Sequence, residues 1–379
     1  MRPSLHSTAI KPNSKHQEYL FHGTLVGHTG ALVCIAATED GKLAASGGTD
    51  GTCVWNLEKD SPLERPSSSG SRGATTYLLW VRREEEPAEI LIFGTQLGLL
   101  VCWKQASPLA FEERNTRPLT GDAEVTGLDF DPATNRLLAC NRNSIVACFT
   151  IERGTLALQP VFSVAMTNVL LKAIAFGEYV NNEKEVLVFG MYDGRIYSLR
   201  GTTGEVLRSR ETRGLIGNAS VNVRKGIYCL NDPFQGIALY RLDDDRRAKT
   251  FEVTRKRNSA RVRQVCFAND AGFVVSGSDH GKIYVFDRWS NNKIVDELNV
   301  GNADWVQTIT STDVNNVSTI LGARSREQDG ANNILVWKKA KTKKRINGTA
   351  IWGQLVSILH VVLVLGALLF LYQNLSLRT

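Results

Sequence analysis

Residues that commonly carry catalysis or bind metals are few and scattered in this chain. Its 379 residues include six histidines, and none of them lies at metal-ligand spacing from a cysteine or a carboxylate. The sequence contains no phosphate-binding GxxxxGKS or GxxxxGKT loop, no GxSxG nucleophile elbow and no HExxH zinc motif. We therefore predict no catalytic residue, no metal site and no cofactor, and we expect that the protein is not an enzyme.

The seven cysteines are irregularly spaced, and no C-x-x-C pair occurs among them. Most of them lie in apolar runs with the character of strands. An odd number of cysteines at irregular spacing is typical of reduced, buried thiols and does not indicate a disulfide framework. They are Cys34, Cys53, Cys102, Cys140, Cys148, Cys229 and Cys266.

The formal net charge is +7, and one basic run near the C-terminal end supplies six of these charges. Because the rest of the chain is close to neutral, we predict no general nucleic-acid-binding surface. The basic run consists of Lys338, Lys339, Lys341, Lys343, Lys344 and Arg345. A second cluster, here called the basic patch, consists of Arg255, Lys256, Arg257, Arg261 and Arg263. The basic patch is interpreted either as a solvated connection or as a site for lipid phosphates.

The basic run is followed by an apolar segment over residues 350–372 that contains no Asp, Glu, Lys or Arg. A helix of this length spans roughly 34 Å, which is enough to cross a hydrocarbon core of about 30 Å. Trp352 and Tyr372 lie near its two ends, where amphipathic rings favour the membrane interface. We predict a single transmembrane helix over 350–372, a basic juxtamembrane linker over 339–349 and a short lumenal tail over 373–379.

The distribution of charge around this segment predicts its orientation. Six basic residues precede it and only Arg378 follows it, so the positive-inside rule places the N-terminal side in the cytosol. Such a layout is similar to that of tail-anchored proteins. The endoplasmic reticulum is the favoured membrane because the span is long and hydrophobic, and the mitochondrial outer membrane is the alternative. Residues 1–16 are polar, lack the apolar core of a signal peptide and are expected to be disordered.

The remaining sequence, residues 17–338, contains a repeated unit of strand, turn and strand. Each unit ends in an aromatic residue or a leucine, and these residues follow one another at steps of 41 to 51. A period of this size predicts the blades of a β-propeller, and seven units predict seven blades. The terminal residues are Trp55, Trp103, Phe149, Leu199, Tyr240, Phe286 and Trp337.

The first unit closely resembles a WD repeat, because it carries a Gly27-His28 pair followed by Ser46, Asp50 and Trp55. In that family the His, Ser, Asp and Trp side chains form a hydrogen-bonded set inside one blade. The resemblance implies an all-β, seven-bladed propeller, here followed by the transmembrane helix. It also implies that the strand-like residues 18–26 complete the seventh blade, which reaches Trp337 without a fourth strand of its own.

The other units depart from the WD pattern. His280 stands where the sixth unit would carry its turn Asp, and Leu97 stands there in the second. We therefore expect these blades to depend on apolar packing instead of on a buried polar set.

A propeller without recognisable chemistry predicts a protein-interaction scaffold that binds other proteins or peptides while anchored to the membrane. The layout is also similar to the exchange factor of the endoplasmic reticulum that starts COPII coat assembly. That resemblance implies a small GTPase as partner, but the Gly-rich loop of that family is replaced by Gly-His-Thr-Gly at 27–30. A third hypothesis is a binder of phosphoinositides or other lipid headgroups through the basic patch, although the Phe-Arg-Arg-Gly motif of phosphoinositide-binding propellers does not occur.

Overall fold

The computed structural model describes residues 18–66, 71–84, 86–180, 183–244, 246–254, 261–301, 305–315, 317–325 and 332–340. The chain falls into two units, residues 1–339 and 340–379. The described residues belong to the first unit, apart from Ala340 at the end of its last strand.

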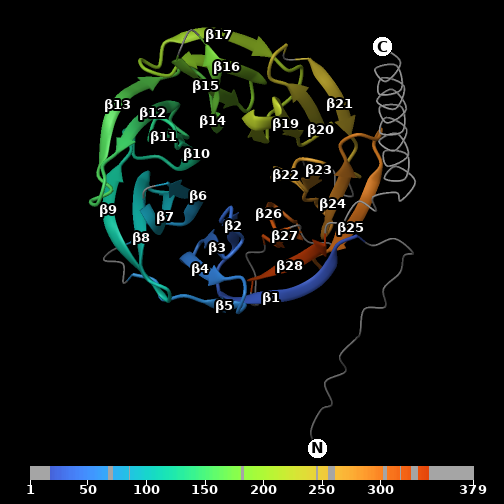
Figure 1. Ribbon diagram of the computed structural model, residues 1–379. Helices are drawn as coiled ribbons and strands as arrows, with labels where there is room; N and C mark the ends of the chain where they lie inside the picture. The colour runs from blue at the N-terminus through green and yellow to red at the C-terminus, as the bar shows by residue number, and fades with distance from the viewer. Residues whose placement is uncertain are drawn as a thin grey trace, which may run out of the picture. The chain divides into compact units, whose positions relative to one another are not determined.

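Within the described residues the chain forms seven four-stranded sheets. Figure 1 shows them as blades that follow one another around a central axis. Blade 1 contains β2 (Leu32–Ala37), β3 (Leu43–Gly48), β4 (Gly51–Asn56) and β5 (Ser61–Pro62). Blade 2 contains β6 (Thr75–Arg83), β7 (Glu86–Thr95), β8 (Leu99–Ser107) and β9 (Ala110–Pro118). Blade 3 contains β10 (Val125–Asp131), β11 (Arg136–Asn141), β12 (Ile145–Ile151) and β13 (Leu158–Ala165).

The later blades repeat the same order from the axis outward. Blade 4 contains β14 (Leu171–Val180), β15 (Glu183–Gly190), β16 (Arg195–Arg200) and β17 (Val206–Glu211). Blade 5 contains β18 (Asn218–Asn222), the short 3-10 helix η1 (Val223–Lys225), β19 (Ile227–Asp232), β20 (Gly236–Arg241) and β21 (Arg247–Phe251). Blade 6 contains β22 (Val265–Ala268), β23 (Phe273–Ser276), β24 (Lys282–Asp287) and β25 (Ile294–Asn299). Blade 7 contains β26 (Thr308–Val314), β27 (Val317–Ala323), β28 (Asn332–Ala340) and β1 (Leu20–His28).

Blade 7 closes the ring with strands from both ends of the propeller. Strand β1 pairs antiparallel with β28, in a register that joins Leu20 to Lys338 and His28 to Asn332. Figure 1 shows β1 running along the outside of the ring beside β28. This confirms the prediction that residues 18–26 complete the last blade. Closure removes an unpaired edge at which the blades could otherwise separate.

The structure confirms the seven repeated units that the sequence predicts. The seven residues that mark the ends of the sequence units all lie on the third strand of a blade, from Trp55 on β4 to Trp337 on β28. Second strands such as β7 and β11 contain short apolar runs, ILIF and LLAC, because both of their faces are covered there by neighbouring blades. Within the described residues, seven apolar clusters form, one in each space between adjacent blades.

Two faces of the ring follow from the strand order. We call the face that carries the loops between the first and second strands of each blade the lower face, and the opposite one the upper face. Since strand direction alternates within a blade, β1 begins at the lower face and β28 ends there. The chain therefore enters and leaves the propeller on its lower face.

Candidate functional site

The four predicted repeat residues are hydrogen-bonded in series inside blade 1. His28 lies at the end of β1, and its Nε2 is 2.7 Å from Ser46 Oγ on β3. The indole nitrogen of Trp55 on β4 donates to the same oxygen at 2.6 Å. His28 Nδ1 is 2.7 Å from Asp50 Oδ1 in the turn between β3 and β4. Because the Asp50 carboxylate can only accept, Nδ1–H of His28 donates to it, and in the neutral ring Nε2 then accepts from the Ser46 hydroxyl.

This set is structural and lies away from the axis of the ring. The side chains of His28, Ser46 and Trp55 are buried. Burial would raise the pKa of Asp50, but hydrogen bonds from His28 and from Thr29 N–H outweigh it and lower the pKa to about 2. Gly27 is required beside this set, since a Cβ there would lie 2.7 Å from the Trp55 ring.

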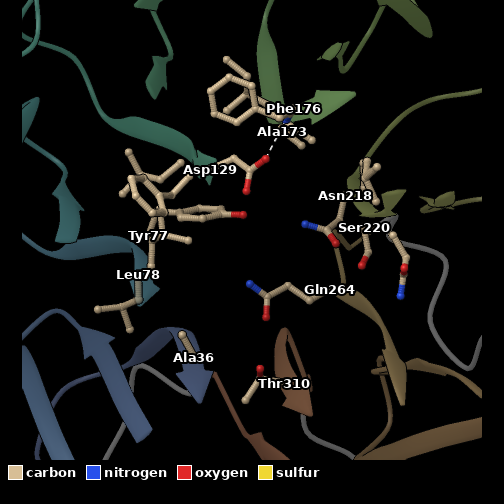
Figure 2. A pocket seen from close by; sticks show the side chains of 18 of the residues that line it. Ala36, Tyr77, Leu78, Asp129, Ala173, Phe176, Asn218, Ser220, Gln264 and Thr310 are labelled. Carbon is tan, nitrogen blue, oxygen red and sulfur yellow. Dashed lines mark hydrogen bonds between the residues drawn. The ribbon is translucent and has the colours of Figure 1, made fainter. Parts of the chain in front are cut away.

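A channel of about 610 Å³ runs along the axis of the ring and is lined by the innermost strands. Figure 2 shows polar side chains turned toward its centre from several blades. Tyr77 comes from β6, Asp129 from β10 and Asn218 from β18, while Gln264 precedes β22 and Thr310 lies on β26. Five blades therefore contribute hydrogen-bonding groups to one space.

Asp129 is the ionisable group at the centre of this arrangement. One of its carboxylate oxygens accepts a hydrogen bond of 2.6 Å from the backbone N–H of Phe176 on β14. The other oxygen faces the channel (Figure 2). Burial raises the pKa of Asp129 to about 6, although the Phe176 N–H and the positive charge of Lys184 oppose this shift. The carboxylate is therefore ionised at neutral pH and becomes protonated in mildly acidic solution.

The opposite wall of the channel presents hydrogen-bond donors. The amide oxygen of Asn218 accepts from Val265 N–H at 3.0 Å, and that of Gln264 accepts from Ile309 N–H at 2.9 Å. Both oxygens are occupied, so the amide nitrogens are turned toward the channel, as Figure 2 shows. Neither nitrogen has a hydrogen-bond partner among the described residues. Each of these two side chains thus ties neighbouring blades together and leaves a donor exposed to the channel.

The channel opens on the lower face into a second cavity of about 590 Å³. Four carboxylates, those of Glu39, Asp40, Glu84 and Glu89, line this mouth together with the single guanidinium of Arg82. Burial raises the pKa of Glu89, and the negative charge of Asp40 adds to this effect. With four carboxylates and one guanidinium among its lining residues, the mouth carries an excess of negative charge.

A family model described as WD domain, G-beta repeat, matches residues 21–56 and 249–287. The first match runs from β1 to β4, and the second runs from β21 to β24. Each match therefore begins on the outermost strand of one blade and continues through the third strand of the next.

The chain is a seven-bladed β-propeller, and these two stretches of it are similar to the WD repeat. WD40 propellers generally bind proteins and are usually non-catalytic scaffolds. No curated protein matches the chain. Among the described residues of the propeller, no three His, Cys, Asp or Glu side chains gather in a way that could hold a metal ion.

Blade 6 of the propeller corrects the expectation that degenerate blades depend on apolar packing alone. His280 Nδ1 lies 2.7 Å from Asp279 Oδ1, and Nε2 lies 2.8 Å from the hydroxyl of Tyr284 on β24. All three residues are buried. An adjacent aspartate and a tyrosine thus replace the Asp, Ser and Trp partners of blade 1. The sequence pattern missed this set because its members stand at different offsets from the histidine.

The basic patch lies only partly within the described residues of the propeller. Arg255, Lys256 and Arg257 fall outside them. The Arg261 guanidinium lies 5.2 Å from the centre of the Trp305 ring, and Arg263 is only 2% exposed. Arg263 is therefore a buried residue of the propeller and is wrongly included in a surface patch.

The basic run is divided between the propeller and the residues that follow it. Lys338 and Lys339 belong to β28, so the propeller extends past its predicted end at 338. Lys339 forms an ion pair with Glu18 and lies 4.3 Å from the centre of the Phe273 ring. The ion pair joins β28 to the residues just before β1 and so helps to close blade 7.

The other predicted basic and membrane segments lie outside the described residues. These are Lys341, Lys343, Lys344, Arg345, the span 350–372 and the tail 373–379. In the part of the chain that the structure describes, no helix is both long and apolar enough to cross a membrane.

The channel residues were not found by reasoning from the sequence. The available signal was a polar residue inside an apolar strand, as with Asp129 in the sequence VTGLDFD. That signal becomes meaningful only when β10 is known to be the innermost strand of its blade.

Proposed function

We propose that this protein is a membrane-anchored scaffold whose propeller binds other proteins or peptides in the cytosol. The observation that carries the proposal is the closed ring with an open polar channel. The seven apolar cores between its blades make the ring rigid. Its channel presents hydrogen-bonding groups to a binding partner, and these belong to Tyr77, Asp129, Asn218 and Gln264. A rigid surface with preorganised polar groups loses little entropy when a partner binds.

Membrane anchoring is supported by the apolar segment 350–372 and by the basic residues before it. The endoplasmic reticulum remains the favoured membrane and the mitochondrial outer membrane the alternative.

The exchange-factor alternative would need a specialised loop in the first blade. Here that connection is a tight turn, in which Thr29 N–H donates to Asp50 at 2.7 Å and Ala31 N–H donates to Thr49 Oγ1 at 3.0 Å. These hydrogen bonds hold the turn as part of the blade. We therefore favour the scaffold over a regulator of a small GTPase.

Proximity labelling tests the scaffold function directly. A biotin ligase is fused to the N-terminus of the full chain, and the control carries the same ligase in front of residues 339–379 only. We expect the full chain to enrich a defined set of cytosolic proteins over the control. If the two labelled sets are the same, the propeller recruits nothing and the proposal fails.

A further inference from the structure

We propose that the channel and its lower mouth form a binding site for a lysine or arginine side chain carried by a peptide segment of a partner protein. The cationic head group would pair with the Asp129 carboxylate. This inference rests on the scaffold function and specifies the chemistry of the partner that the scaffold recognises.

The path from the lower face to Asp129 is continuous. The channel cavity and the mouth cavity share Leu79, Asp129, Phe130 and Pro132 among their lining residues. A side chain that enters at the mouth therefore passes these residues and reaches the carboxylate without crossing a wall. Long, unbranched side chains such as lysine and arginine are suited to a site at the end of such a path.

The charge of the mouth favours a cation at the entrance. Glu39, Asp40, Glu84 and Glu89 face one basic group of the same mouth, Arg82. Asp40 also pairs with Lys42 at 3.1 Å, but the Lys42 side chain is 65% exposed and does not belong to the residues that line the mouth. The excess of carboxylates would attract a basic peptide and repel an acidic one before any close contact forms.

The middle of the path is apolar. Leu79 and Phe130 are half-buried in the channel wall, and Pro132 is exposed at the mouth beside them. The methylene groups of a lysine or arginine stem bury well against such residues while the charged end continues past them.

At the deep end of the site, hydrogen-bond acceptors lie on one wall of the channel and hydrogen-bond donors on the opposite wall. Asp129 presents an oxygen to the channel and Tyr77 presents its hydroxyl, as Figure 2 shows. Across the channel, the amide nitrogens of Asn218 and Gln264 can donate to backbone carbonyl oxygens of a peptide. A cation together with carbonyl oxygens is what a basic peptide segment offers.

The nearest basic side chain of the propeller does not neutralise Asp129. Lys184 on β15 lies 2.5 Å from Asp131 Oδ1, so its charge is paired with that carboxylate. The charged and titratable groups that line the channel together with Asp129 are Tyr77, Asp131, Lys184, Glu39 and the exposed Arg224. A bound cation would stabilise the ionised form of Asp129, and a proton would compete with the cation.

The binding experiment uses the full chain in detergent micelles and four pools of labelled heptapeptides, read by fluorescence anisotropy. The pools have random sequences with a fixed central lysine, arginine, norleucine or glutamate, and both peptide ends are blocked. We expect the lysine and arginine pools to bind at least tenfold more tightly than the norleucine pool, which has a similar stem without the charge. Equal binding of the lysine and norleucine pools would overturn the proposal.

The Asp129→Asn variant isolates the carboxylate charge. Its amide oxygen can still accept the hydrogen bond from Phe176 N–H, so the inter-blade contact is kept, and circular dichroism checks the fold. We expect the preference for lysine over norleucine to fall below threefold. The matched control is Asp122→Asn, which removes one exposed carboxylate at a position with φ of 42°, a conformation that asparagine also accepts. The control should keep the full preference, and a preference retained by Asp129→Asn contradicts the proposal.

The pH dependence of peptide affinity distinguishes loss of the Asp129 charge from a change in folding. Because the peptide binds the ionised carboxylate, the affinity for the lysine pool should be constant above about pH 6 and fall about tenfold per pH unit below it. The norleucine pool and the Asp129→Asn variant should show no such fall. An unchanged affinity of the wild-type chain between pH 7.5 and pH 5 speaks against the site.

Proximity labelling of both variants separates this inference from the scaffold function. We expect Asp129→Asn to lose cytosolic proteins that the wild-type chain and Asp122→Asn enrich. If all three chains enrich the same proteins, the scaffold stands and the channel site is rejected. If the wild-type chain enriches none, the scaffold function itself fails.

Discussion

Buried polar side chains in this propeller act in short connected sets. In blade 1 the set runs from Asp50 through His28 and Ser46 to Trp55, and in blade 6 His280 links Asp279 to Tyr284. Each member satisfies a neighbour that would otherwise be buried without a partner. The loss of one member therefore costs more than a single hydrogen bond.

Ser46 is the residue whose removal tests this point. The Ser46→Ala variant leaves both the Trp55 indole N–H and His28 Nε2 without a partner in a buried site. At about 1 to 3 kcal/mol for each unpaired group, we expect the free energy of unfolding to fall by about 2 to 4 kcal/mol. Urea denaturation of the full chain, followed by tryptophan fluorescence, measures the change. The control is Ser163→Ala on the exposed side of β13, and equal midpoints for the two variants would contradict the cooperative set.

Asp129 illustrates the opposite case, in which a residue suited to binding lowers stability. Because burial raises its pKa to about 6, the folded state disfavours the ionised form that exists at neutral pH. Stability is therefore unaffected below the unfolded pKa near 4 and falls as pH rises through 6. We expect Asp129→Asn to be more stable than the wild type at pH 7.5 by up to about 2 kcal/mol, since water in the channel screens part of the effect. Thermal unfolding at pH 7.5 and pH 4.5 tests this, and the same difference at both values would refute it.

At the scale of the element, closure of the ring depends on how β1 begins. The backbone N–H groups of Glu18 and Tyr19 donate to Asp296 on β25 at 2.8 and 2.7 Å. The Tyr19 side chain is fully buried between blades 6 and 7, and its hydroxyl lies 2.9 Å from Ser318 Oγ on β27. The first residues of the propeller thus fasten β1 to two blades before it pairs with β28.

A Tyr19→Ala change should loosen this closure. It removes a large buried ring, for which losses of about 3 to 5 kcal/mol are typical, and it frees the start of β1. We expect faster proteolysis near residue 19 and a lower denaturation midpoint. Tyr19→Phe is the matched control, since it loses only the hydroxyl contact and about 1 kcal/mol. If both variants are cleaved at the rate of the wild type, β1 is held by its pairing with β28 alone.

At the scale of the whole molecule, location and topology can be measured together. An N-terminally tagged full chain is compared by fluorescence microscopy with a version that ends at Arg345, and protease is added to permeabilised cells. We expect the full chain to mark an organelle, the truncated version to be diffuse and the tag to be digested from the cytosolic side. A diffuse full chain would refute anchoring by residues 350–372.

The sequence by itself determined the number of blades, their spacing along the chain and the closure of the ring. The last residues of the units are regularly spaced from Trp55 to Trp337, and one extra strand lies at 18–26. These patterns can be recognised even in units that lack the WD motif residues. The polar set of blade 1 was also legible, since Gly27-His28 and Trp55 stand at the offsets that a WD repeat requires.

Only the tertiary structure decided which residues meet at the axis. Asp129, Asn218 and Gln264 are separated by scores of residues and are brought together because each lies on or beside the innermost strand of its blade. The same structure showed that Arg263 and Lys339 are held by internal contacts, although both belong to basic clusters of the sequence. Strand periodicity fixes the position of a side chain along its own blade, whereas contact across the channel depends on the closure of all seven blades.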